Sequence, residues 1–203
     1  MMIRNEDYFI IDNWYENPYE VRKTALDLLK TEKIDSRIPG IRSKYVSYDL
    51  LNFNKTKFEQ ILSKKIDETY WLHINSLNLN DILDKINFTN PLMIEKFPIS
   101  NSGIVVDNGR FQLITKNDKL WDVHQDTTNW ASVVYLTPNA PKDCGTSFYE
   151  KISETKSFMS IENIFNRCII YKSKIPHKST NHFGSDYIDG RLTQTFFFNL
   201  KDE

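Results

Sequence analysis

The first half of the chain spaces its hydrophobic positions as helices do, after one short strand. Tyr8-Phe9-Ile10-Ile11 predicts that strand, and a helix is predicted to begin at Asn17-Pro18, because proline is tolerated in the first helical turn. The apolar stripe of this helix consists of Val21, Ala25, Leu28 and Leu29. A second helix is predicted over about residues 55–66, with an apolar face of Phe58, Ile61, Leu62 and Ile66. We expect both stripes to be core that packs against a sheet.

From about Gly103 onward, β-branched and aromatic runs between turn residues predict a series of strands. The predicted strands cover residues 104–106, 110–115, 121–126, 131–137, 146–149, 167–172 and 191–199. Several short strands without long helices between them indicate a sandwich or jelly roll, whose open mouth commonly holds a metal or ligand. The expected fold class is therefore α+β but mainly β.

We expect one domain over residues 1–203, because this length buries one sizeable core and no linker or repeat interrupts it. About residues 1–100 would give helical support to a core at about 104–199. The 26 Lys and Arg against 27 Asp and Glu leave a net charge of −1, so neither nucleic acid nor a membrane is an expected partner. The acidic N-terminus and the lack of a long apolar run predict a soluble, cytoplasmic protein. Its two cysteines, Cys144 and Cys168, have no metal-ligand spacing and predict no disulfide framework.

The most informative chemical pattern is His124-Gln125-Asp126. Alternation along a strand places His124 and Asp126 on one face, together with Asp122. Asp126 is the better-placed carboxylate for a shared ion. Because an isolated His-x-Asp pair often arises by chance, the prediction depends on His177, which follows the predicted strand 167–172 and could reach back over a pocket. Two histidines and one carboxylate form a facial triad, which leaves adjacent positions on a ferrous ion open.

The last predicted strand adds a second group to this site. Alternation sets Arg191, Thr193, Thr195 and Phe197 on one face of it. A guanidinium is a planar fork suited to bidentate capture of a carboxylate, and a threonine two residues on can add a hydrogen bond. A metal triad together with a carboxylate-binding arginine suggests a co-substrate that chelates with one end and is held at the other. 2-Oxoglutarate has that shape.

The sequence resembles the Fe(II)- and 2-oxoglutarate-dependent dioxygenases, on the side of the prolyl-hydroxylase-like members and of small bacterial and phage homologues. The likeness rests on five segments in order: HQD at 124–126, VVYL at 133–136, CGTSF at 144–148, YKSKIPH at 171–177 and GRLTQTFFF at 190–198. It extends more weakly to FIIDNWYENPYEVR at 9–22 and to PGIR at 39–42. The resemblance implies a double-stranded β-helix, a cupin-like jelly roll with the N-terminal helices packed on its sheet.

The resemblance also implies a role for individual residues. His124, Asp126 and His177 would bind Fe(II), Arg191 would pair with the distal carboxylate of 2-oxoglutarate, and Thr193 would assist it. Tyr135 stands where related enzymes often place a tyrosine on the same carboxylate, although an ordinary core role fits it nearly as well. CGTSF departs from the family's GGxTxF-like turn at Cys144, and the His177 to Arg191 spacing implies a longer hairpin loop than the shortest in the family.

The sequence contains two further histidines, His182 and His73. His182 is the rival third metal ligand, because it lies closer to Arg191 along the chain. His177 is preferred, since it directly follows a strand whereas the surroundings of His182 read as loop. His73 has no acidic residue near it in sequence and is expected to be structural.

The expected activity is hydroxylation that uses Fe(II), 2-oxoglutarate and O2 and releases succinate and CO2. The resemblance favours hydroxylation over halogenation, because halogenating relatives carry a small residue at the place of Asp126. A Zn(II)-dependent hydrolase and a non-catalytic jelly-roll binding module remain alternatives. A peptide, a free amino acid and another small metabolite all stay open as substrate, and the pattern predicts no oligomeric state. The residues considered for the pocket border are Trp121, Trp130, Phe111 and the loop 178–189.

Overall fold

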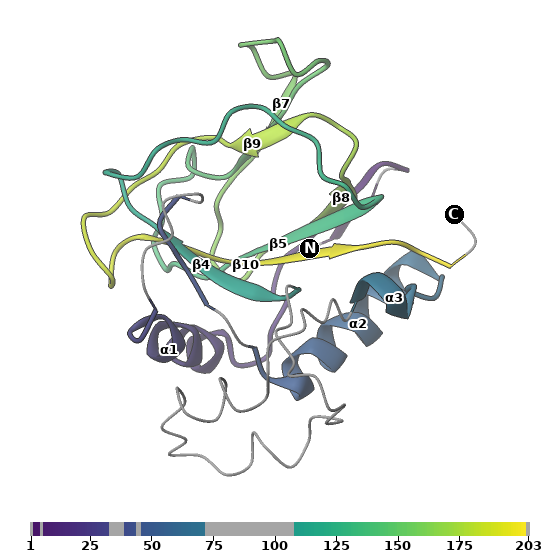
Figure 1. Ribbon diagram of the computed structural model, residues 1–203, viewed down its shortest axis with the longest axis horizontal. Coiled ribbons are helices and arrows are strands. Elements are labelled where there is room, and N and C mark those ends of the chain that lie inside the picture. Colours follow the sequence, from purple (N-terminus) through teal and green to yellow (C-terminus); the bar gives the residue numbers. More distant parts are fainter. Residues whose placement is uncertain (1, 5, 33–38, 44–45, 72–107, 202–203) are drawn as a thin grey trace.

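Two antiparallel sheets form the body of the protein, with helices on the outer face of the larger one (Figure 1). The computed structural model describes residues 2–4, 6–32, 39–43, 46–71 and 108–201. The large sheet has the strand order β1 (Met2–Arg4), β2 (Tyr8–Ile11), β8 (Cys168–Lys172), β5 (Trp130–Tyr135), β10 (Arg191–Phe198), β4 (Arg110–Ile114) and β3 (Ile41–Arg42). The small sheet has the order β7 (Met159–Ile161), β6 (Thr146–Phe148) and β9 (His177–Ser179).

The central strand β10 shows why the large sheet has two different faces. Its even-numbered side chains, such as Leu192 and Phe196, belong to the core under the helices. Its odd-numbered side chains, such as Arg191 and Thr193, line a cavity on the opposite face. Successive residues of a strand point to opposite sides, so one sequence segment builds both the core and the site. The predicted alternation of this strand is confirmed.

Among the described residues, three helices cover the outer face: α1 (Pro18–Leu29), α2 (Tyr48–Leu62) and α3 (Glu68–Trp71). The predicted start of the first helix is confirmed, with Pro18 in its first turn. The second helix begins earlier than predicted, because the Ser47 side chain caps it by accepting a hydrogen bond from the Leu50 N–H at 3.1 Å. It also ends earlier, since Ser63 adopts the left-handed conformation. Ile66 is buried beyond the helix, in an isolated bridge with Leu200.

Aromatic rings dominate the core between the helices and the large sheet. Phe58 from α2 stacks on Phe198 with ring centroids 5.2 Å apart, and Trp71 from α3 stacks on Phe196 at 5.9 Å. All four side chains are fully buried. Such rings bury large areas and carry much of the energy of a core. This core therefore fixes β10, and with it the residues on the other face of that strand.

Buried polar contacts tie the N-terminal segment to the strands. The Tyr15 hydroxyl donates to Gln194 Oε1 at 2.5 Å, and the Tyr15 backbone exchanges two hydrogen bonds with the Asn166 side chain, both at 2.8 Å. Asp12 accepts from Arg167 Nε at 2.6 Å. Buried polar groups need such partners, so these contacts specify one position for the segment.

Six of the seven predicted strands that fall on described residues correspond to β2, β4, β5, β6, β8 and β10, with ends that shift by at most two residues. The prediction of a strand over 121–126 is wrong: only His124 pairs there, in an isolated bridge with His177 of β9, so no ladder of pairs forms along this polar segment. The predicted strand 104–106 lies outside the described residues. The short strands β1, β3, β7 and β9 were not predicted, since they carry no long apolar run.

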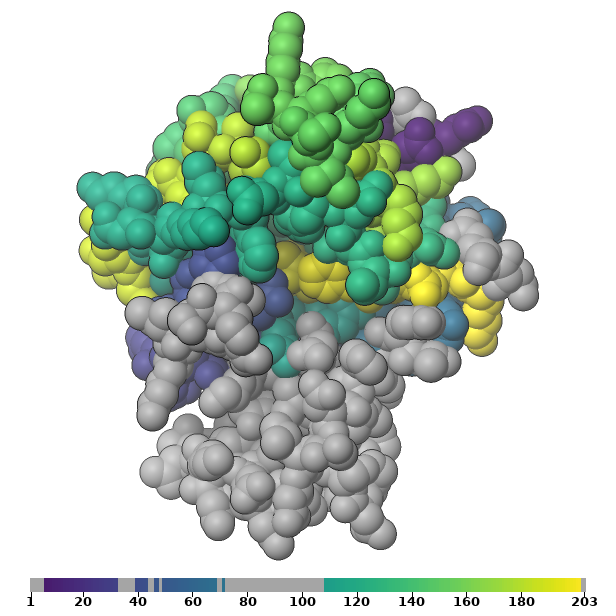
Figure 2. Space-filling model, turned by 45° about the horizontal axis from the view of Figure 1, so that its top comes forward, coloured from purple at the N-terminus to yellow at the C-terminus, as the bar shows by residue number. Residues whose placement is uncertain are grey.

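The two sheets pack face to face over a second, smaller core that includes Phe148, Ile161 and Tyr171. The turn between β6 and β7 projects from the small sheet, and its side chains Ile152 and Phe158 are exposed (Figures 1 and 2). No described helix combines the length and the apolar character needed to cross a membrane.

Candidate metal centre

Backbone pairing brings together two segments that lie far apart in sequence. The His124 N–H donates to the His177 carbonyl at 3.0 Å, and the His177 N–H donates back to the His124 carbonyl at 2.8 Å. Two residues further on, the Asp126 N–H donates to the Ser173 carbonyl at 3.1 Å. The short strand β9 thus places His177 directly opposite the extended segment that carries His124 and Asp126.

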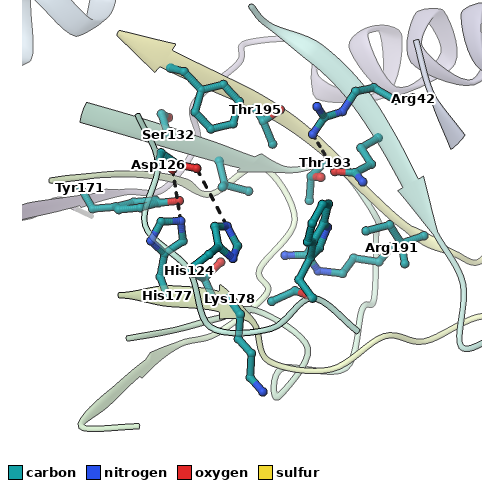
Figure 3. Close-up of a pocket in the computed structure, with 17 residues that line it drawn as sticks. Arg42, His124, Asp126, Ser132, Tyr171, His177, Lys178, Arg191, Thr193 and Thr195 are labelled. Carbon is teal, nitrogen blue, oxygen red and sulfur yellow. Dashed lines mark hydrogen bonds and ion pairs between the residues drawn. The ribbon is translucent and has the colours of Figure 1, made fainter. Parts of the chain in front are cut away.

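The side chains of His124, Asp126 and His177 converge at this point (Figure 3). Each offers one possible ligand atom, and these atoms all lie within 4.8 Å of one another. His177 Nε2 is 3.3 Å from Asp126 Oδ2, and His124 Nε2 is 3.9 Å from Asp126 Oδ1. The His177 side chain is 5% exposed and that of His124 is 39% exposed, so the cluster is buried on one side and open on the other.

Hydrogen bonds to the backbone fix the tautomer of both imidazoles. His124 Nδ1 lies 2.9 Å from the Asp122 carbonyl, and His177 Nδ1 lies 2.8 Å from the Ile175 carbonyl. A carbonyl oxygen can only accept, so each neutral ring must carry its proton on Nδ1. The lone pair of each Nε2 then points toward Asp126. Ligating histidines are commonly oriented by such a bond from the second ring nitrogen.

The Asp126 carboxylate shows that this arrangement suits a cation. Its Oδ2 atom is buried and has no hydrogen-bond partner among the described residues, although His177 Nε2 is close. With the tautomers above, a carboxylate oxygen and two nitrogen lone pairs face one another with no proton between them. Buried acceptors in this position are costly unless a positive charge lies between them. The donor set of two imidazoles and one carboxylate fits a divalent transition metal.

Arg191 lies in the same cavity, at the other end from the histidines in Figure 3. It is buried, and its Nε and Nη2 donate to the carbonyls of Cys144 at 3.0 Å and Gly145 at 3.1 Å. Burial lowers the pKa of this guanidinium from its ordinary value. No acidic side chain in the described part of the chain pairs with it. A buried guanidinium that faces a cavity without a carboxylate partner is suited to bind an anionic ligand.

Thr193 and Tyr135 adjoin Arg191. Thr193 lies two residues along β10, lines the cavity, and has a buried hydroxyl without a hydrogen-bond partner among the described residues. Tyr135 is the cross-strand neighbour of Thr193, and its ring centroid is 5.6 Å from Arg191 Cζ. The Tyr135 hydroxyl shares a 2.8 Å hydrogen bond with Thr146 Oγ1, and burial raises its pKa. Tyr135 itself is not part of the cavity wall.

The cavity between the sheets has a volume of about 270 Å³ and joins the metal cluster to Arg191. Of the aromatic residues considered for its border, Trp121 lines it and lies against His124 with ring centroids 5.7 Å apart. Trp130 and Phe111 instead belong to the core under the helices. Within the loop 178–189, Lys178 and Ser179 reach the cavity wall.

His182 lies elsewhere. Its Nε2 is 3.0 Å from the Ser179 hydroxyl and its Nδ1 is 3.3 Å from the Asp118 carbonyl, and it lines a separate surface pocket. Burial lowers its pKa. Among the described residues it does not join the cluster of His124, Asp126 and His177. His73 lies outside the described residues.

The two cysteines take no part in the metal cluster. Both are buried free thiols. Burial raises the pKa of Cys144 to about 11 and that of Cys168 to about 12. Thiols with such pKa values stay protonated at neutral pH, and a protonated thiol is a poor metal ligand.

The sequence patterns do not identify every residue of the cavity wall, and Tyr171 and Arg42 are two that they leave out. Tyr171 packs its ring edge-on against His177 at 4.8 Å, and Arg42 enters the cavity from the edge strand β3. Alternation along the strand 167–172 could have indicated Tyr171, because it shares a face with Ile169 in the core between the sheets. Nothing in the local pattern around Arg42 predicts a two-residue strand that pairs with β4.

Comparison with solved structures identifies similar folds. A prolyl hydroxylase from Trichoplax adhaerens, in complex with a hypoxia inducible factor oxygen degradation domain peptide fragment, matches with a TM-score of 0.52 and 15% identity over 96% of this chain and 84% of that one. A prolyl-4-hydroxylase from Pseudomonas putida matches with a TM-score of 0.50 and 14% identity over 95% and 91%. HygX from Streptomyces hygroscopicus, with nickel, 2-oxoglutarate and hygromycin B bound, matches with a TM-score of 0.50 and 11% identity over 97% and 84%.

Sequence comparison adds nothing to these matches: no family model and no curated protein matches the chain. Identities of this size show the fold alone. The chain therefore has the fold of the prolyl hydroxylases and of HygX, in agreement with the resemblance of its sequence to the Fe(II)- and 2-oxoglutarate-dependent dioxygenases.

Proposed function

We propose that the protein is an Fe(II)- and 2-oxoglutarate-dependent dioxygenase that hydroxylates a small-molecule or peptidyl substrate and releases succinate and CO2. One observation carries the proposal: a cluster of two imidazoles and a carboxylate shares a cavity with a buried arginine that has no acidic partner among the described residues. Bound Fe(II) would supply the activation of O2 and the oxidative decarboxylation of 2-oxoglutarate. The protein would supply ligand geometry, charge and a shaped cavity.

In this proposal His124, Asp126 and His177 hold the metal ion. The backbone carbonyls of Asp122 and Ile175 accept the Nδ1 protons and so keep both Nε2 lone pairs directed at the ion. The ion would in turn satisfy Asp126 Oδ2. A ligand set of two imidazoles and one carboxylate would leave coordination positions on the ion for the co-substrate and O2.

Arg191 would bind the distal carboxylate of 2-oxoglutarate, with Thr193 as an additional donor. The two backbone carbonyls that hold Arg191 Nε and Nη2 fix the plane of the guanidinium in advance. The Thr193 hydroxyl is buried without a described partner and so has a proton to donate. Tyr135 is the proposed third donor at this end of the site: it lies behind the cavity wall, its hydroxyl is bonded to that of the wall residue Thr146, and it would donate to the carboxylate when the Thr146 hydroxyl donates in their shared bond.

The fold comparisons support this assignment without extending to the substrate. One neighbour holds nickel and 2-oxoglutarate, and another holds a peptide fragment. We also propose that the two sheets together form the double-stranded β-helix of this group. Hydroxylation is the proposed outcome rather than halogenation, because the halogenating relatives in the family that the sequence resembles carry a small residue at the place of Asp126.

The test is the conversion of 2-oxoglutarate by purified protein. We expect succinate to form when Fe(II), O2 and ascorbate are supplied, and not when Zn(II) replaces Fe(II). Arg191→Met should raise the KM for 2-oxoglutarate by about 10- to 100-fold, since a charge-assisted pair is lost. Lys30→Ala, which removes an exposed cation on the helical side, is the matched control.

Other results would contradict the proposal in distinct ways. Hydrolytic activity with Zn(II) and no succinate with Fe(II) would indicate a hydrolase that uses the same three ligands. Binding of 2-oxoglutarate without any succinate, with and without added candidate substrates, would indicate a binding module.

A further inference from the structure

The turn between β8 and β9 leads directly into His177 and lies against the segment that carries His124 and Asp126. The Ile175 N–H donates to the Lys172 carbonyl at 3.0 Å, which closes the turn. The Ile175 carbonyl is 2.8 Å from His177 Nδ1. One turn therefore orients one candidate metal ligand and contacts the segment of the other two.

Lys174, in the middle of this turn, is bonded to the opposite segment at both ends. Its Nζ donates to the carbonyls of Asp126 and Thr127, both at 3.0 Å. Its own carbonyl accepts a hydrogen bond from Gln125 Nε2. We call these three hydrogen bonds the Lys174–Gln125 latch. Both side chains are exposed, and neither lines the cavity.

The latch acts where a regular strand ladder is absent. The segment 121–126 makes one isolated bridge, at His124. Beyond the bridge, the Asp126 N–H donates to the Ser173 carbonyl at 3.1 Å, and the Ser173 N–H donates to the Asn129 carbonyl at 3.0 Å. Backbone groups that no ladder pairs need other partners, and side chains supply them here. The latch therefore contributes to holding the backbone of Asp126 against the turn that precedes His177.

The charge of Lys174 makes its role distinguishable by sign. An ammonium group bonded to the carbonyl of Asp126 repels a cation that the same residue would bind through its carboxylate. If Lys174 acted by charge alone, its removal would strengthen metal binding. If it holds Asp126 in place, its removal weakens metal binding, because the Asp126 carboxylate must keep facing both imidazoles (Figure 3).

Gln125 provides the same comparison without a change of charge. Its neutral amide donates to the Lys174 carbonyl, and it lies between His124 and Asp126 in sequence. Alternation along this extended segment directs the Gln125 side chain away from the side that His124 and Asp126 share. Its replacement therefore removes a bond of the latch and leaves the three candidate ligands and the local charge unaltered.

We propose that Lys174 and Gln125 are positioning residues of the metal centre. The latch fixes the backbone of Asp126 relative to His177 and so holds the three ligands in a metal-binding arrangement before the ion arrives. Residues outside the ligand set commonly tune metal affinity by orienting the ligands. This inference rests on the metal site of the proposed function, and not on the reaction.

The experiment titrates the full-length protein with Co(II), used as a spectroscopic probe. Calorimetry gives the Kd, and the visible absorption spectrum of bound Co(II) reports on the ligand arrangement. The variants are Gln125→Ala, Lys174→Met, Lys174→Arg and the double variant of Gln125→Ala with Lys174→Met. Lys151→Met makes the same substitution at an exposed lysine of the β6–β7 turn and is the matched control. His177→Ala removes a ligand, and the Tm of each protein in chelator checks the fold.

We expect Gln125→Ala and Lys174→Met each to weaken Co(II) binding by about 3- to 10-fold, the factor that corresponds to about one hydrogen bond. The double variant should lose less than the product of the two factors, because the two residues share one set of contacts. Both variants should alter the Co(II) spectrum and leave the Tm in chelator close to that of the wild type. Lys174→Arg should retain most of the affinity, since it keeps a charged donor, and Lys151→Met all of it.

Unchanged or tighter Co(II) binding in Lys174→Met or in Gln125→Ala would overturn the inference. An equal loss of affinity in Lys151→Met, or a loss that Lys174→Arg does not restore, would do the same. A large fall of the Tm in chelator in both variants would also overturn it, by making the latch a general structural contact. If the wild type and His177→Ala bound Co(II) equally, the metal site of the proposed function would itself be refuted, and the inference with it.

Discussion

Replacement of Asp126 by Asn should stabilise the metal-free protein and remove its stabilisation by metal. In the metal-free state, Asp126 Oδ2 is buried 3.3 Å from His177 Nε2 and lacks a hydrogen-bond partner among the described residues. An asparagine amide can donate an N–H to that lone pair. A buried polar group without a partner costs about 1 to 3 kcal/mol, so we expect a gain of about 1 kcal/mol.

The assay is thermal unfolding at pH 8, once with chelator and once with a divalent metal. For a chain of this size, about 1 kcal/mol corresponds to a Tm increase of about 2 to 4 °C in chelator. In the presence of the metal, the wild type should have the higher Tm, because metal binding stabilises the wild type and not the variant. The control is Asp122→Asn, an equal charge change at an exposed neighbour. The reasoning would be refuted if the variant had a lower Tm than the wild type in chelator. It would also be refuted if metal raised the Tm of both proteins equally.

Two further predictions concern the fold. Phe58→Ala should lower the free energy of unfolding by about 3 to 5 kcal/mol, measured by chemical denaturation, because this fully buried ring stacks in the helix-facing core; a loss below about 1 kcal/mol would contradict that packing. The hydrogen bond from Arg167 holds the pKa of Asp12 below its ordinary value of 3.8, so the stability this carboxylate contributes is complete above that value and is lost as the pH falls through the lowered pKa. The stability difference between wild type and Asp12→Asn should therefore shrink in acid, and a difference that grows as the pH falls would reverse the assigned sign.

The elements that could be predicted from sequence are those whose hydrophobic residues recur with a regular spacing. The helix at Pro18 and the strand at Arg191 have unambiguous apolar spacing, and both were predicted close to their observed bounds. The segment 121–126 has a strand-like alternation, but it forms only one bridge, because strand formation needs a partner that local sequence does not encode. Its extended conformation still sets His124 and Asp126 on one side.

In the candidate site, too, some features follow from local sequence and others depend on long-range pairing. The closeness of His124 to Asp126 follows from their spacing, whereas the closeness of either to His177 depends on strand β9, a Lys-Ser-containing segment with no apolar signal. The position of Arg42 has even less local signal, because a strand of only two residues brings it beside Gln112, which lies far away in sequence. Long-range pairing is a property of the folded sheet, so a single sequence does not reveal which edge residue will face the cavity.

The most direct test of the account compares metal binding at the two competing histidines. Protein is reconstituted anaerobically with Fe(II) and 2-oxoglutarate, and the weak visible charge-transfer band of the chelate is recorded for wild type, His177→Ala and His182→Ala. The account predicts the band in wild type and in His182→Ala and its loss in His177→Ala, because only His177 joins His124 and Asp126 within 4.8 Å among the described residues. A band that survives in His177→Ala and disappears in His182→Ala would contradict it.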